Sequence, residues 1–166
     1  MSRAFVNEDN HQEAPIIRPR ADLPEGVTNY VTPNGFQALL DEKEALLLEQ
    51  KNLENRSESE LRSMHTVING KLQMLDLRIA SARIIDPETQ PKDTIHFSAN
   101  VLMQILPSDK TQQFQIVGVD EADLKKGKIA FTSPLAKALS LKKAGDIAEL
   151  HLAHGTRSFK ILSISY

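Results

Sequence analysis

Two leucine-rich segments with helical spacing, separated by a short polar stretch, constrain the fold of this chain most strongly. In the first segment, Leu39, Leu46 and Leu53 recur every seven residues. In the second, positions separated alternately by four and three residues form a coiled-coil seam, namely Leu61, His65, Ile68, Leu72, Leu75, Ile79 and Ala82. The connection between the segments is short, so we predict an antiparallel helical hairpin with arms about 30 Å long.

The limits of this hairpin follow from proline positions. Thr32 followed by Pro33 is typical of an N-cap with proline in the first turn of a helix. At the other end, Pro87 in the stretch "IIDPETQPKD" cannot continue a helix. We therefore predict a hairpin over residues 32–86, with its tip at about residues 54–60.

The sequences on either side of the hairpin differ in character. Residues 1–31 combine prolines with polar residues and show no apolar periodicity, which predicts a flexible arm without secondary structure. Residues 87–166 contain short β-rich runs and one helical piece, "SPLAKALSL". This part is expected to be a small antiparallel sheet packed against one helix, which gives an α+β fold overall.

Composition excludes several classes of protein. The chain has no cysteine, so it contains neither disulfides nor thiolate metal sites. No run approaches the ~18 to 20 apolar residues of a membrane span, and we expect a cytoplasmic protein with no membrane contact. The net charge is −2, and only the last third is mildly basic, which argues against a general nucleic-acid binder.

Motifs for catalysis are weak. The "DEAD" sequence at residues 120–123 has no glycine-rich phosphate loop upstream, so we interpret it as an acidic turn between strands. His151 and His154 have a poor ligand spacing for a strand, and the serines lack an evident general base. We therefore expect a protein that is not itself an enzyme and that binds no cofactor stably.

The acidic stretch "NLENRSESEL" at the tip is the remaining candidate site. If the first helix continues through it, Glu54 and Glu58 fall on one helix face, where carboxylates could share Mg²⁺ with a partner. Alternatively, these acids only keep a turn solvated, as most charge runs do. The residues alone leave both interpretations open.

A resemblance to a known family gives these segments a common meaning. The stretches "RIIDPE", "IVGVDEADLKKGKIAFTSPLAKALSLKKAGD" and "FKILSISY" resemble the C-terminal domain of the bacterial Gre transcript-cleavage factors, and "NYVTPNGFQALLDE" resembles the start of their coiled coil. The resemblance implies an FKBP-like C-terminal domain that docks on RNA polymerase while the coiled coil enters the secondary channel. Acidic tip residues would then help to hold Mg²⁺ at the active site of the polymerase, which cleaves its own backtracked RNA.

The resemblance also implies roles for individual residues. Glu58 takes the position of the family's tip glutamate, whereas Asn55 stands where an aspartate is expected and Arg62 where a tyrosine is expected. Glu54 and Glu60 are the flanking tip candidates. The polymerase-binding candidates are Asp120, Glu121, Asp123, Ser133, Pro134 and Leu135.

The expected function is that of a Gre-type elongation factor acting as a monomer, with only indirect contact to nascent RNA and DNA. Stimulation of cleavage is one outcome. The alternative is a non-cleaving Gre-like regulator that occupies the channel and competes with true cleavage factors, because the hairpin is shorter than is typical of the family and Asn55 brings no charge. A prolyl isomerase and a generic coiled-coil interaction protein are further alternatives, disfavoured by the few aromatics and by the charged outer helix faces.

Overall fold

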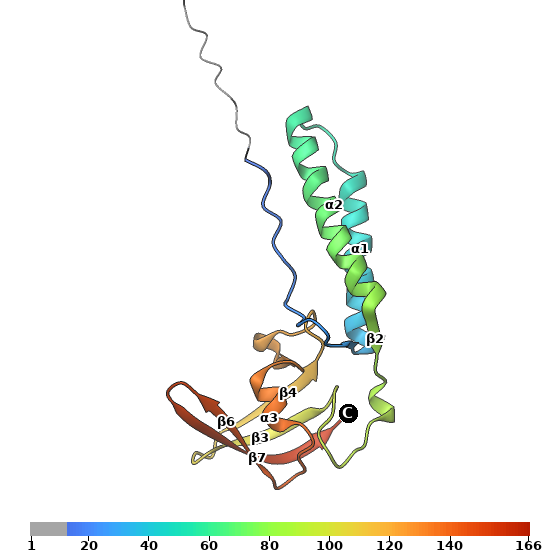
Figure 1. The fold of residues 1–166 in the computed structure, drawn as a ribbon. Helices are drawn as coiled ribbons and strands as arrows, with labels where there is room; N and C mark the ends of the chain where they lie inside the picture. Colours follow the sequence, from blue (N-terminus) through green and yellow to red (C-terminus); the bar gives the residue numbers. More distant parts are fainter. Residues whose placement is uncertain (1–12) are drawn as a thin grey trace, which may run out of the picture.

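A two-helix rod standing on a small β-rich body makes up the structure, a computed structural model that describes residues 13–166 (Figure 1). Helix α1 spans Pro33–Lys51 and helix α2 spans Glu58–Ser81. At 1.5 Å per residue they are about 28 and 36 Å long. Thr32 caps α1, since its hydroxyl oxygen accepts the Gly35 N–H at 2.8 Å. The predicted start of the hairpin is therefore confirmed.

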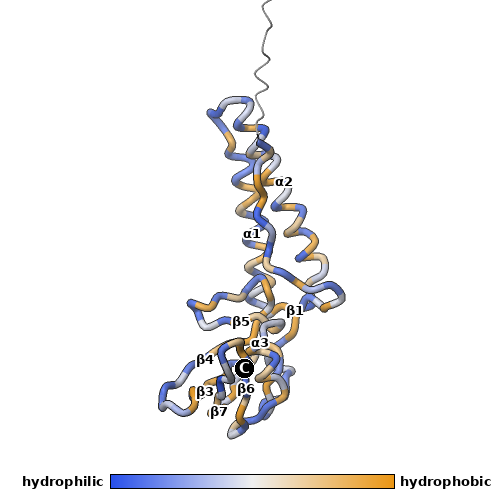
Figure 2. The backbone as a smooth tube through the Cα atoms, turned by 60° about the vertical axis from the view of Figure 1, so that its left-hand side comes forward, coloured by the Kyte–Doolittle hydropathy of each residue, from blue (hydrophilic) through white to orange (hydrophobic). Residues whose placement is uncertain are grey.

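The predicted seam is the interface between the two helices. Its buried side chains are Leu39, Leu46, Ile68 and Leu75, with Leu53, Leu72 and Ile79 packed against them. Figure 2 shows apolar and polar residues alternating along both helices. The prediction is wrong for His65, which is exposed, while Met64 is half-buried. An α-helix drifts by about 20° per heptad relative to a strict seven-residue repeat, so the inward face changes toward one end of the rod.

The base of the rod differs from the prediction. Helix α2 ends at Ser81 instead of continuing to residue 86, because the next residues form strand β2 (Ala82–Ile84). This strand pairs in parallel with β1 (Asn29–Val31). The prediction that residues 1–31 have no secondary structure is therefore wrong for β1. Residues 13–28 contain neither helix nor strand.

The body is built on a five-stranded sheet with the order β5-β4-β3-β7-β6. Its strands are β3 (Asn100–Leu106), β4 (Thr111–Val117), β5 (Lys128–Ala130), β6 (Ile147–Leu152) and β7 (Gly155–Ser165). The pairs among β3, β4, β6 and β7 are antiparallel as predicted. Strand β5 pairs in parallel with β4, because residues 118–127 return the chain to the same end of the sheet. Two 3-10 turns, η1 (Pro87–Thr89) and η2 (Leu124–Lys126), complete the connections.

One α-helix, α3 (Pro134–Leu139), packs on this sheet, as the sequence predicted. Its Ala136 and Leu139 join Val101, Met103 and Ile161 in the main core. The expected fold class is confirmed as an α+β protein with an antiparallel helical hairpin followed by a small, mostly antiparallel sheet that packs one helix. Within residues 13–166, no helix combines the length and hydrophobicity needed to cross a bilayer.

Candidate functional site

The tip of the rod is a six-residue loop, residues 52–57, between the two helices. Helix α1 ends at Lys51, where the Asn52 N–H caps the carbonyls of Leu48 and Glu49. Because α1 does not continue, Glu54 lies in the loop and Glu58 lies in the first turn of α2. The suggestion that these two carboxylates share one helix face is therefore wrong.

Asn55 has a conformational role in this loop. Its φ of 62° lies in the left-handed region, which Asn tolerates better than most other residues with a side chain. The residue that replaces an expected aspartate is thus one that suits the turn. Its side chain is exposed, as are those of Glu54 and Glu58.

The two glutamates at the start of α2 differ in what holds them. Glu60 forms a capping box with Ser57, accepting the Ser57 N–H at 3.0 Å and the Ser57 hydroxyl at 2.8 Å. Both hydrogen bonds lower the pKa of the Glu60 carboxyl, and the one from the Ser57 side chain has the larger effect. Glu58 instead pairs with Arg62, one turn further along α2, and both side chains are more than three-quarters exposed. Glu60 is therefore occupied by the helix start, whereas Glu58 is held only by an exposed ion pair that costs little to break.

The tip does not form a metal site by itself. Across the described part of the chain, no three His, Asp or Glu side chains gather in a way that could hold a metal ion. Glu58 could supply one oxygen ligand to a hard cation such as Mg²⁺, whose remaining ligands would come from elsewhere.

The N-terminal arm approaches the tip, which the sequence did not indicate. Glu13, Ala14 and Pro15 line a hollow of about 660 Å³ together with the first turns of α2, including Glu58 and Arg62. Sequence reasoning missed this contact because the arm has no periodicity from which a packing face could be recognised.

The base of the rod contains the first two polymerase-binding candidates. Asp120 accepts a hydrogen bond from Arg20 Nε at 2.9 Å and pairs with Arg78 Nε at 3.3 Å. Glu121 accepts the Thr32 hydroxyl at 2.5 Å and pairs with Lys128 Nζ at 3.2 Å. Both carboxylates are close to 10% exposed, so in this structure they join the rod to the body and do not face outward.

The other four candidates lie on the body around two short helical turns. Asp123 caps η2 by accepting the Lys125 N–H, and Ser133 caps α3 by accepting the Ala136 N–H. Leu135 is half-buried against the main core. Pro134, at the start of α3, is exposed. The six candidates therefore do not form one surface: two belong to the junction and four lie beside short helix starts.

An aromatic cluster also fastens the junction. Tyr30 of β1 packs against Phe97 and Phe131 of the body, with ring centroids 5.9 and 5.7 Å apart. Gly118 allows this approach, since a Cβ there would lie 2.6 Å from the Tyr30 carbonyl oxygen. Tyr30, Arg20 and Arg78 were not candidates from sequence. Their partners are distant along the chain, and no local pattern marks them.

Fold and tip together define a class of protein: an antiparallel coiled-coil hairpin with an acidic end, carried on a small α+β domain. The family described as "Transcription elongation factor, GreA/GreB, C-term" matches residues 90–166. Transcription elongation factor GreA of Acidiphilium cryptum is 42% identical over 113 residues, covering 68% of this chain and 72% of that protein. GreA of Thermodesulfovibrio yellowstonii is 30% identical over 151 residues, covering 82% of this chain and 96% of that protein.

The chain belongs to the GreA/GreB family of transcription elongation factors. Members are accessory factors and not enzymes, which confirms that expectation. Among solved structures, GreA factor homolog 1 of Thermus thermophilus is similar, with a TM-score of 0.40 and 20% identity over 84% of this chain and all of that one. GreA/GreB from Nitrosomonas europaea aligns with a TM-score of 0.42 and 19% identity over 82% of this chain and 98% of that one.

Proposed function

We propose that this protein binds RNA polymerase through its C-terminal domain, inserts the hairpin into the secondary channel and regulates elongation in the cytoplasm as a monomer. The observation that carries the proposal is the position of Glu58. It is an exposed carboxylate at the far end of a rod about 30 Å long, on a body with a GreA/GreB C-terminal domain. Such a rod can reach a site that the body is too wide to enter.

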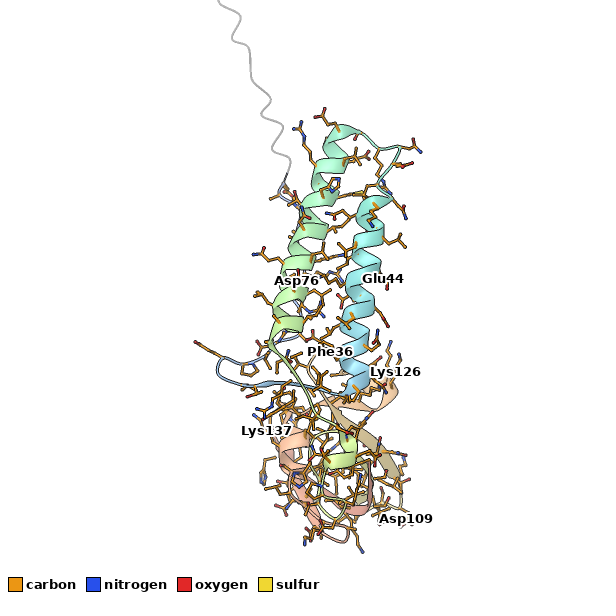
Figure 3. All side chains as sticks on the ribbon, turned by 90° about the vertical axis from the view of Figure 1, so that its right-hand side faces the viewer. Phe36, Glu44, Asp76, Asp109, Lys126 and Lys137 are labelled. Atoms are coloured by element: carbon orange, nitrogen blue, oxygen red, sulfur yellow. The ribbon has the colours of Figure 1, made fainter. Side chains whose placement is uncertain are left out.

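Surface exposure along the rod supports insertion into a polar channel. The outer faces of both helices carry charged side chains, of which Glu44 of α1 and Asp76 of α2 are labelled in Figure 3. Lys43 of α1 and Asp76 form an exposed ion pair at 2.8 Å across the rim of the helix seam.

The tip would contribute a single carboxylate ligand to a metal ion held by the partner. Glu58 would leave Arg62 and offer a carboxylate oxygen to a Mg²⁺ ion that the polymerase also holds. The exposed ion pair costs little to break, because surface pairs are worth about 0–1 kcal/mol. A Mg²⁺ ion supplies charge stabilisation and an activated water in phosphodiester hydrolysis.

A specific observation favours the second candidate, a non-cleaving regulator that competes for the channel. Asn55 supplies no charge, and Glu60 is held in the capping box by Ser57. Glu54 and Glu58 remain as exposed tip carboxylates, but Glu54 lies in the loop and Glu58 on α2, so the ion would be held more weakly than by two carboxylates on one helix face. Both candidates share polymerase binding and differ in the fate of the RNA.

Binding is tested by co-purification of the full chain with core RNA polymerase at low salt. A complex is expected, and it should weaken with the substitution Pro134→Glu, which places a charge at the exposed start of α3. Absence of a complex would overturn the proposal.

Cleavage is tested on a backtracked elongation complex. Shortening of the RNA 3′ end on addition of the protein, lost in Glu58→Ala and retained in Glu25→Ala, would support the cleavage factor. Glu25 is a matched control, because it is exposed and lies in the arm away from the tip. Unchanged RNA, together with inhibition of a true cleavage factor, would support the competitor.

A further inference from the structure

Residues 13–28 of the N-terminal arm lie along the rod although they contain neither helix nor strand. In Figure 1 this coloured part of the arm leaves the base of the rod and runs in the same direction as the rod. Ile17 is half-buried against α2, where its Cδ1 occupies the space in which a side chain at Gly70 would begin. Arg78 of α2 donates a hydrogen bond to the Ala21 carbonyl. Contacts to side chain and backbone thus hold residues 17–21 on one face of α2.

Arg20 connects this arm to two further parts of the molecule. Its guanidinium donates to both carboxylate oxygens of Glu42 on α1, at 2.7 and 3.1 Å. Its Nε donates to Asp120, in the connection that follows β4 of the body, at 2.9 Å. One side chain therefore bridges the arm, the rod and the body. A planar guanidinium with several donors can do this, whereas a lysine ammonium offers a single charged point.

The surroundings make this bridge stronger than a surface ion pair. The side chain of Arg20 is 17% exposed, that of Asp120 is 9% and that of Arg78 is 13%. The hydrogen bond to Glu42 raises the pKa of Arg20, and the charge of Asp120 adds to this against the opposing effect of burial. Asp120 Oδ2 is buried without a hydrogen bond and faces Arg78 at ion-pair distance. Loss of Arg20 would leave Asp120 with half of its compensating charge, which is costly at low exposure.

We propose that residues 17–21 form a strap that fixes the direction in which the rod leaves the body, and that Arg20 is its positioning residue. The strap runs from Gly70, midway along α2, to the base of the rod, where Arg20 contacts Asp120 of the body. It also covers Asp120, which the family resemblance had assigned to a partner. This inference goes beyond polymerase binding and holds whether or not the chain binds polymerase.

The absence of cysteine makes a direct distance measurement straightforward. Cysteines introduced at Glu54 in the tip loop and Lys137 on α3, both exposed positions, accept nitroxide labels for pulsed electron paramagnetic resonance. The full chain is expected to give one narrow distance distribution. Arg20→Gln should broaden it to at least twice the width, or shift its centre, with unchanged far-ultraviolet circular dichroism.

Two further variants separate a strap from a general effect of charge. Arg20→Lys should give an intermediate width, because lysine can retain one of the two carboxylate contacts. Arg18→Gln should leave the distribution unchanged, since Arg18 is an exposed arginine in the same arm. A distribution for Arg20→Gln that matches the unsubstituted protein would overturn the proposal, as would equal broadening by Arg18→Gln.

Discussion

The tip and the base of the rod both carry acidic side chains, but the two regions use them in opposite ways. At the tip, Glu58 is exposed and its partner Arg62 lies on the same helix. At the base, Asp120 is nearly buried and its partners, Arg20 and Arg78, come from distant parts of the chain. Charges at the base therefore define the shape of the molecule, and charges at the tip remain available for another molecule.

The same contrast holds for apolar contacts. Toward the base, Leu75 is completely buried in the helix seam, and Tyr30 adds the aromatic contact to the body. Toward the tip, Leu53 and Leu61 are only half-buried. We infer that the rod is anchored at its base and is least stable at its end, where loops that must adapt to a partner are commonly found.

The largest effect should come from removing apolar volume near the base. Leu75→Ala empties a fully buried position and is expected to lower the free energy of unfolding by about 2–5 kcal/mol. Leu53→Ala, the matched truncation near the tip, should cost less than half as much because the site is already partly open. Urea denaturation followed by circular dichroism measures both. Equal losses would show that the rod is packed uniformly along its length.

Asp120→Asn should give the next largest effect. It removes the negative charge between Arg20 and Arg78, and the charge-assisted hydrogen bond from Arg20 is worth about 1.5–3 kcal/mol. Glu58→Gln at the tip is the control and should change stability by less than about 0.5 kcal/mol. Thermal melting at fixed pH compares the two variants. If they melt together, the junction carboxylate contributes no more than a surface charge.

The contrast between tip and base also explains what could be predicted from the sequence. The seam, the start of α1 at Thr32 and the acidic tip depend on neighbouring residues, so spacing and capping rules identify them. The early end of α2 at Ser81 could not be found in this way, because β2 pairs with a strand more than fifty residues earlier. Likewise, the sequence marks Asp120 as acidic and gives no sign that Arg20 lies against it.

A pH experiment tests whether the capping box at the tip is formed in solution. The Ser57 hydrogen bonds lower the pKa of Glu60, so their contribution to stability is present above the pKa of the unfolded chain and is lost as the pH falls through the folded value. Ser57→Ala should therefore raise the Glu60 pKa toward its ordinary value and weaken the acid dependence of stability. Carboxyl NMR titration measures the shift. Ser63→Ala, an exposed serine on α2, is the control, and an unchanged Glu60 pKa in Ser57→Ala would contradict the assignment.

The smallest effect is expected midway along the rod, where the arm meets Gly70. Glycine within a helix costs up to about 1 kcal/mol relative to alanine, so Gly70→Ala alone favours α2. The added methyl group displaces the Cδ1 of Ile17, which is the flexible end of a side chain and can rotate away. The net change should therefore be a gain of a few tenths of a kcal/mol in the free energy of unfolding. Gly70→Ala should give a larger gain when it is made in the Ile17→Ala variant, because the added methyl group then meets no side chain.

Denaturation of the four proteins in this cycle measures how firmly the arm is packed. If Gly70→Ala destabilises the protein only while Ile17 is present, the arm is held as rigidly here as at the base; if it stabilises both backgrounds equally, the arm is held chiefly by Arg20.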